Sequence, residues 1–151
     1  MKVHAKQDTL YAPPASEVAL EDHCQYKYLF NYRGVAASFR LKHLFLCGSL
    51  VLHAEDRWLE FFYPRMKPWV HYMPVKTGAS KSEIRELLQF AQENDQVVSQ
   101  IAERGHHFIQ DHLRMKDVLC YWKKLLLSYA SLLTYQPHLH QGLMKIIKKA
   151  S

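Results

Sequence analysis

The sequence lacks an apolar run long enough to cross a membrane. A spanning helix needs about 20 consecutive apolar residues, and the best candidate, Leu41 to Leu52, is interrupted by Lys42, His43 and Gly48. The first residues are basic, but no apolar segment follows them, which is unlike a secretory signal. We therefore expect no membrane span and no signal peptide in the sequence as written.

Several catalytic motifs are also missing. The chain has no P-loop, GxSxG, HExxH or GxGxxG, and no Asp-x-Asp pair that would hold a metal on a nucleotide diphosphate. NTPase, hydrolase and metalloprotease functions therefore lose their usual support, and we expect no metal site. Cysteine is scarce: Cys24, Cys47 and Cys120 have no zinc-ligand spacing, and an odd number leaves a thiol that needs a partner elsewhere.

The composition that remains is that of a globular domain. Of 151 residues, 48% are apolar and 23% are charged, which excludes disorder and allows one real core. The net charge of +6 favours anionic partners such as nucleotides, phosphates, nucleic acid or acidic lipid. Because no stacking motif is interleaved with the basic residues, we expect no nucleic-acid partner.

Strand patterns alternate with one helix pattern in the N-terminal half. Residues 26–32 are aromatic-rich and end at Arg33-Gly34, which predicts a buried strand, and residues 39–47 predict a helix that ends at Gly48. Residues 49–54 predict a second strand. Residues 68–75 predict a third, with prolines marking its ends.

Past residue 79 the apolar period becomes helical. The capping box Ser80-x-x-Glu83 opens one helix, and residues 97–109 and 117–133 predict two more. Strands followed by consecutive helices predict an α/β layer closed by a helical tail. The last helix is apolar on more than one side, so we expect another surface to cover it.

The stretch from Val35 to Arg40 is the best candidate binding site. Ala36 and Ala37 let a ligand approach the backbone, Ser38 is placed to cap the following helix, and the free amides of a first helical turn attract anions. Arg40 adds a bidentate donor for a diphosphate oxygen. A strand joined to a capped helix is also common without a ligand, so the pattern alone leaves both interpretations open.

Histidines and one carboxylate are further candidates. His71, among apolar neighbours, is either a hydrogen-bonded core residue or a contact to a base or sugar. Glu60, between aromatic residues, either binds a buried donor or holds a ribose hydroxyl. His106 and His112 lie six residues apart, roughly 600° around a helix, and this spacing predicts packed or solvated side chains rather than metal ligands.

Long stretches of the chain closely resemble the Rumi-type protein O-glucosyltransferases, a CAP-ten-like glycosyltransferase family. The segments that carry the resemblance are Cys24–Ser49, which includes Asn31-Tyr32-Arg33-Gly34-Val35-Ala36-Ala37-Ser38-Phe39-Arg40, then Trp58–Pro64, Lys67–Lys76, Ile101–Gly105 and Cys120–Trp122. The resemblance extends from about Asp22 to Tyr135.

The resemblance implies a metal-independent, inverting transfer of glucose, or of xylose as a second donor sugar, from the UDP-sugar to serine in EGF-like repeats such as those of Notch-type receptors. It implies an α/β fold: the C-terminal Rossmann-like half of a GT-B enzyme, ending in several helices. We expect a lead-in segment at 1–21, the donor-binding half-domain at 22–135 and a basic tail at 136–151. The alternative is a catalytically inactive binding or regulatory module that docks on a partner chain.

The resemblance also assigns residues. It places UDP-glucose against Val35, Ala36, Ala37, Ser38, Phe39 and Arg40, and Glu60 is added as the candidate for the ribose. It pairs Cys24 with Cys47, bonds Cys120 to the N-terminal half and implies the endoplasmic reticulum lumen. We expect that N-terminal half, which holds the general base, to be missing, so that this chain alone is inactive. The tail also lacks the family's Lys-Asp-Glu-Leu-like ending.

Overall fold

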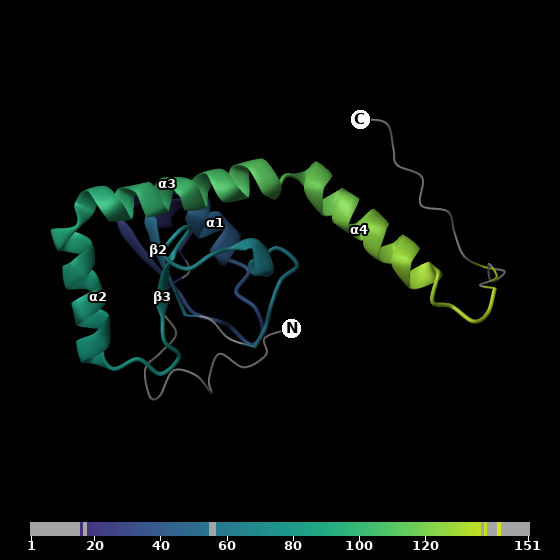
Figure 1. The fold of residues 1–151 in the computed structure, drawn as a ribbon, viewed down its shortest axis with the longest axis horizontal. Coiled ribbons are helices and arrows are strands. Elements are labelled where there is room, and N and C mark those ends of the chain that lie inside the picture. Colours follow the sequence, from purple (N-terminus) through teal and green to yellow (C-terminus); the bar gives the residue numbers. More distant parts are fainter. Residues whose placement is uncertain (1–15, 17, 55–56, 137, 139–141, 143–151) are drawn as a thin grey trace. The chain divides into compact units, whose positions relative to one another are not determined.

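The computed structural model describes residues 16, 18–54, 57–136, 138 and 142. The chain divides into two compact units, residues 1–114 and 115–151 (Figure 1). No helix in the described ranges is long and apolar enough to cross a membrane. The first unit holds the sheet and most of the helices, and the second holds one described helix, α4 (Met115–Ala130).

A parallel three-stranded sheet forms the centre of the first unit. Its strands are β1 (Tyr28–Asn31), β2 (Leu50–Ala54) and β3 (Met73–Val75), in the order β1-β2-β3. Each strand is short and mostly apolar, as strands covered on both faces are. The parallel sheet confirms the predicted α/β class and is compatible with a Rossmann-like glycosyltransferase fragment.

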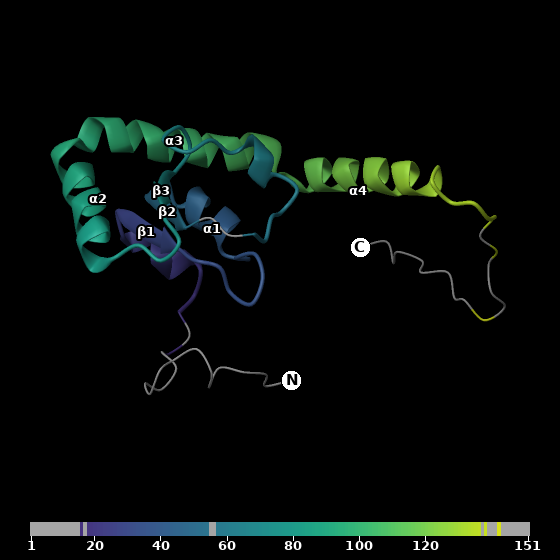
Figure 2. The ribbon, with the colours of Figure 1, turned by 60° about the horizontal axis from the view of Figure 1, so that its bottom comes forward.

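Helices cover the sheet and connect its strands. The first unit contains η1 (Glu21–Gln25), α1 (Leu41–Leu46), η2 (Tyr63–Arg65), α2 (Lys81–Glu93) and α3 (Asp95–His112). The predicted capping box is present. The Glu83 amide donates a hydrogen bond to the Ser80 hydroxyl, and the Ser80 amide donates one to the Glu83 carboxylate. α2 and α3 meet at a sharp bend, in Figure 1 and in Figure 2 alike.

Two apolar clusters lie on the faces of the sheet. One packs α1 against Val51, Tyr72 and the end of α3, and the other packs β2 and β3 against the start of α3 and one face of α2. Gly105 is required where α3 passes closest to its neighbours. A Cβ built there would lie 2.4 Å from the His71 carbonyl oxygen and 2.8 Å from the Phe45 ring.

The prolines are placed differently from the sequence prediction. The third strand covers only Met73–Val75, and Pro74 is its middle residue rather than its end. β3 is an edge strand, which is where a sheet tolerates proline. Residues 69–71 form a turn instead of a strand, and Trp69 has a positive φ of 63°.

Candidate functional site

The loop from residue 32 to residue 40 leaves the carboxyl end of β1 and leads into α1. The Gly34 amide donates to the Ala36 carbonyl oxygen at 3.1 Å, which forms a turn inside the loop. Val35 is 87% exposed and Phe39 is 65% exposed. The loop therefore presents backbone and apolar side chains to solvent at the carboxyl edge of the sheet.

Ser38 does not cap α1, contrary to the sequence prediction. Arg40 is the N-cap residue and makes no side-chain capping bond, and the helix has only six residues. The Ser38 hydroxyl instead donates to Asn31 Oδ1 at 2.6 Å, and the Leu41 amide donates to the Ser38 carbonyl oxygen at 3.2 Å. The Ser38 hydroxyl thus bonds to the buried side-chain amide of Asn31 instead of to the amides at the start of the helix.

A buried polar network lies behind the loop. Asn31 and His53 are partners in the register of β1 and β2, and the Asn31 amide nitrogen donates to His53 Nδ1 at 3.0 Å. Ser38, Asn31 and His53 are 6%, 0% and 4% exposed. Hydrogen bonds therefore join the three side chains at the carboxyl end of the sheet, as is usual for buried polar groups.

His53 is held in its neutral form. Burial lowers its pKa from 6.5 to about 4, because the charged imidazolium would lose its hydration. Its ring meets those of Tyr63 and Tyr72 edge-on, with centroids 5.8 and 5.3 Å away.

Arg40 is exposed at the start of α1. Within the described residues its guanidinium makes no ion pair and no hydrogen bond. Its backbone carbonyl accepts the His43 and Leu44 amides, which anchor the main chain while the side chain stays in solvent. The guanidinium is therefore available to an anion at the end of the loop.

Glu60 lies beside the first turn of α1. Its carboxylate is 3.9 Å from Lys42 Nζ, and that ammonium lies 4.1 Å from the centre of the Phe39 ring. The side chains of Lys42 and Glu60 are about a quarter exposed. The structure thus connects Glu60 to the loop through Phe39 and Lys42, and the part of the lysine was not predicted from the sequence.

Two buried polar atoms close to these residues have no hydrogen-bond partner in the described part of the chain: His43 Nε2 and the Tyr63 hydroxyl. Burial raises the pKa of Tyr63 to about 12, and the negative charge of Glu60 adds to the shift. Tyr63 is therefore a neutral hydroxyl, able to donate.

His71 and His106 have partners outside the loop and its polar network. His71 is half-buried, accepts the Lys67 amide on Nδ1 at 2.9 Å and packs on Phe108, which fits the hydrogen-bonded alternative. His106 Nδ1 lies 3.3 Å from the Phe45 carbonyl oxygen. Among the described residues, no three His, Cys, Asp or Glu side chains gather as metal ligands would.

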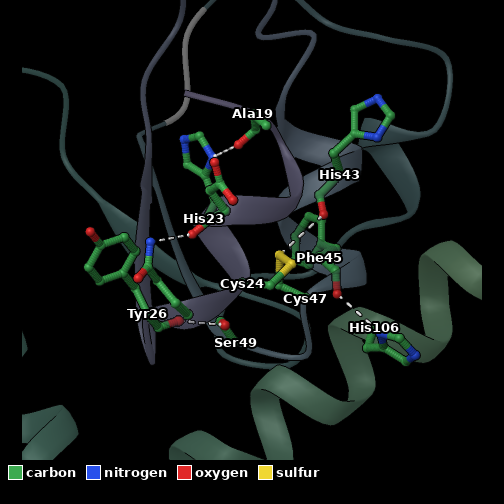
Figure 3. The surroundings of a disulfide bond; sticks show 11 residues. Ala19, His23, Cys24, Tyr26, His43, Phe45, Cys47, Ser49 and His106 are labelled. Carbon is green, nitrogen blue, oxygen red and sulfur yellow. Dashed lines mark hydrogen bonds between the residues drawn. A yellow bond between two sulfur atoms is a disulfide. The ribbon is translucent and has the colours of Figure 1, made fainter. Parts of the chain in front are cut away.

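A disulfide joins the opposite, amino end of the sheet. Cys24 in η1 is bonded to Cys47 after α1, the pairing that the resemblance implied (Figure 3). Close by, the Ser49 hydroxyl donates to the Tyr26 carbonyl oxygen at 2.7 Å. Cys120, in the second unit, is an exposed free thiol.

Sequence reasoning missed Asn31 and His53. Both are polar residues at or near the carboxyl end of an otherwise apolar strand, and that position was the available indication. Ligands of open α/β sheets bind at this edge, so a polar residue that closes an apolar strand pattern is a candidate for the site.

Comparison with known proteins places the chain in a family. The family model for glycosyl transferase family 90 matches residues 2–151. The chain is 64% identical over 130 residues to O-glucosyltransferase rumi of Drosophila pseudoobscura pseudoobscura. This match covers 86% of this chain and 32% of that protein. It is 59% identical over 143 residues to protein O-glucosyltransferase 1 of Homo sapiens, covering 95% of this chain and 36% of that protein.

The match is long within this chain and partial within its relatives. The chain spans about a third of the length of these curated relatives. The Rumi-type resemblance is confirmed, and the chain belongs to glycosyl transferase family 90.

Proposed function

We propose that this chain binds the donor in a UDP-glucose-dependent protein O-glucosyltransferase. The names of its relatives support a glycosyltransferase that acts on proteins. In the proposed reaction, glucose or xylose passes from the UDP-sugar to serine in EGF-like repeats, such as those of Notch-type receptors. The transfer inverts the configuration at the anomeric carbon of the sugar and uses no metal.

The observation that carries the proposal is the position of the Val35–Arg40 loop. It follows the first strand of a parallel sheet, at the carboxyl edge where α/β folds bind nucleotides. Residues 34–36 are exposed, and the exposed residue Arg40 stands at the end of the loop. Small residues and the Arg40 guanidinium at this edge suit a diphosphate.

Each group has one part in this proposal. Arg40 neutralises the charge that develops on the diphosphate when the sugar leaves, and the Val35–Ser38 backbone receives its oxygens. Glu60 accepts a ribose hydroxyl, while Lys42 beside it adds positive charge to the site. The general base acts from another part of the longer enzyme, so this chain alone binds the donor without transferring it.

The cysteines support a secretory compartment for the enzyme. The Cys24–Cys47 disulfide is stable in an oxidising lumen, and we place the enzyme in the endoplasmic reticulum. The exposed thiol of Cys120 is then the partner for a cysteine in the N-terminal half of the longer enzyme.

Isothermal titration of the 151-residue chain with UDP and UDP-glucose tests donor binding. We expect binding that is unchanged by EDTA and is weakened roughly tenfold to a hundredfold by Arg40→Ala, because a charge-assisted hydrogen bond contributes about 1.5–3 kcal/mol. Arg85→Ala is the matched control, since it removes an equal charge from the exposed face of α2. Absence of binding in the folded wild type would overturn the proposal.

A second candidate function, an inactive module that docks on a partner chain, is favoured by α4. This helix has no buried residue, and Leu119, Leu126 and Leu127 on it are each about 60% exposed. Exposed apolar surface of this kind marks an interaction site. Light scattering that shows a monomer, with no binding of an apolar dye, would count against docking.

A further inference from the structure

The loop proposed to bind the diphosphate is closed at its base by a side-chain hydrogen bond. Asn31 is the last residue of β1 and Ser38 follows seven residues later, yet the Ser38 hydroxyl reaches Asn31 Oδ1 at 2.6 Å. The residues between them form a loop whose two ends are joined. This bond is hereafter called the clasp.

A second buried hydrogen bond, from Asn31 to His53, supports the clasp. The Asn31 side chain uses its two ends in opposite directions, accepting from Ser38 and donating to His53 Nδ1 at 3.0 Å. His53 lies on the neighbouring strand, in register with Asn31, and its ring packs edge-on with the Tyr63 and Tyr72 rings. The orientation of the amide is therefore set by two buried partners.

Most of the remaining loop is exposed, and the Tyr32 ring at its start stacks on Phe30 of β1. Residues 32–36 are all exposed, and Val35 contributes almost no buried surface. The Gly34–Ala36 turn and a hydrogen bond from Arg33 Nη1 to the Gly34 carbonyl oxygen are internal to the loop. The clasp is thus a buried connection from the loop to the sheet, and a loop released from it would lose conformational order before binding.

We propose that Asn31 and His53 are positioning residues, which act through the Ser38 hydroxyl to hold the Val35–Ser38 backbone in the conformation that receives a nucleotide diphosphate. This inference rests on the proposed function. It adds to that function two side chains that touch no ligand and yet set its affinity, because they reduce the ordering that binding would otherwise require.

The chain offers a matched control for Ser38. Ser49 is an equally buried serine, at 8% exposure, whose hydroxyl donates to the Tyr26 carbonyl oxygen at 2.7 Å at the other end of the sheet (Figure 3). Each substitution removes the only hydroxyl of a buried serine and one hydrogen bond of similar length, so Ser49→Ala controls for the loss of a buried hydroxyl. Only Ser38→Ala releases the loop.

The experiment is a titration of the full chain with UDP-glucose, below the unfolding temperature of every variant. We expect Ser38→Ala and Asn31→Ala each to weaken binding about tenfold, and Ser49→Ala to leave it unchanged. The double variant Ser38→Ala/Asn31→Ala should bind no more weakly than either single variant, since both break the same clasp. If Ser38→Ala does not fold, Ser38→Cys, which keeps the volume but donates weakly, replaces it.

The outcomes separate the two proposals. If the wild type binds and the Ser38 and Asn31 variants bind equally well, the positioning role is wrong while donor binding stands. Additive losses in the double variant, or an equal loss in Ser49→Ala, also overturn the positioning role. If the folded wild type binds neither UDP nor UDP-glucose, the proposed function fails, and the positioning role fails with it.

Discussion

The two ends of the parallel sheet are held together in different ways. At the amino end the connections are a disulfide, Cys24–Cys47, and a hydrogen bond from Ser49 to a backbone carbonyl oxygen. At the carboxyl end they are hydrogen bonds between the side chains of Ser38, Asn31 and His53. One end depends on covalent and backbone partners, and the other depends on the identity of three side chains.

This difference separates scaffold from site. A covalent bond and a backbone acceptor fix the chain whatever the neighbouring side chains are. A network of three buried side chains must be satisfied as a unit, and it loses stability when any member is changed. Buried polarity is therefore concentrated at the edge where α/β folds bind ligands, and the amino end provides rigidity.

The largest effect is expected at the scaffold end, from Gly105→Ala. The new Cβ would meet the His71 carbonyl oxygen, which cannot move without displacing the turn before β3. We expect a loss of roughly 3–4 kcal/mol in the free energy of unfolding, even after the ~1 kcal/mol that alanine contributes in a helix interior. Urea denaturation measures it. Gly34→Ala is the control: its Cβ meets nothing within 4 Å, so a loss of similar size there would contradict the steric argument.

Removal of the disulfide is expected to cost somewhat less. Cys24→Ser/Cys47→Ser opens a loop of 23 residues, for which chain entropy predicts about 3 kcal/mol. UDP-glucose affinity at a temperature where the variant is folded should be unchanged, because the disulfide lies at the amino end of the sheet and the proposed site lies at the carboxyl end. Cys120→Ser, which removes a free thiol, controls for thiol chemistry. A variant as stable as the wild type would show that the disulfide is not part of the scaffold.

Acid should weaken the carboxyl end through His53. Its pKa falls from 6.5 to about 4 on folding, so the unfolded chain binds the proton more readily. The stabilisation is present above pH 6.5 and is lost as pH falls toward 4. Linkage predicts a loss of about 2 kcal/mol between pH 7 and pH 5.

The measurement is urea denaturation at each pH, for the wild type and for His53→Gln. The glutamine variant lacks the titrating ring, so its stability should fall less steeply over this range. Burial also lowers the pKa of His71, which remains in both proteins and cancels in the comparison. Equal slopes for the two proteins would show that His53 does not remain neutral in the folded state.

Much of the scaffold follows from local sequence, and less of the site does. Apolar runs bounded by turn residues located β1 and β2, and the Ser80–Glu83 spacing located the start of α2. These features depend on neighbours a few residues away. The clasp depends on a contact over seven residues and on a second contact, between Asn31 and His53, over 22.

Ser38 shows why this limit is physical. Its sequence position suited a helix cap, and in isolation a serine there would bond to the nearest free amides. The buried Asn31 side chain competes for the same hydroxyl. An unpaired amide oxygen in the interior costs more free energy than an uncapped helix end in contact with water, so the bond to Asn31 forms. Which of two local bonds forms was decided by tertiary burial.

The smallest effect is expected from Ser80→Ala, after the carboxyl end of β3. Ser80 and Glu83 are exposed or partly exposed, so their bonds compete with water, unlike those of Asn31. The variant should lose about 1 kcal/mol of stability in urea denaturation, the usual value of an N-cap serine. Ser80→Asp keeps an acceptor for the Glu83 amide and should stay within a few tenths of a kcal/mol of the wild type. If instead Ser80→Ala cost more than Ser38→Ala, burial would not be what distinguishes the network behind the loop from the exposed polar groups at the same edge.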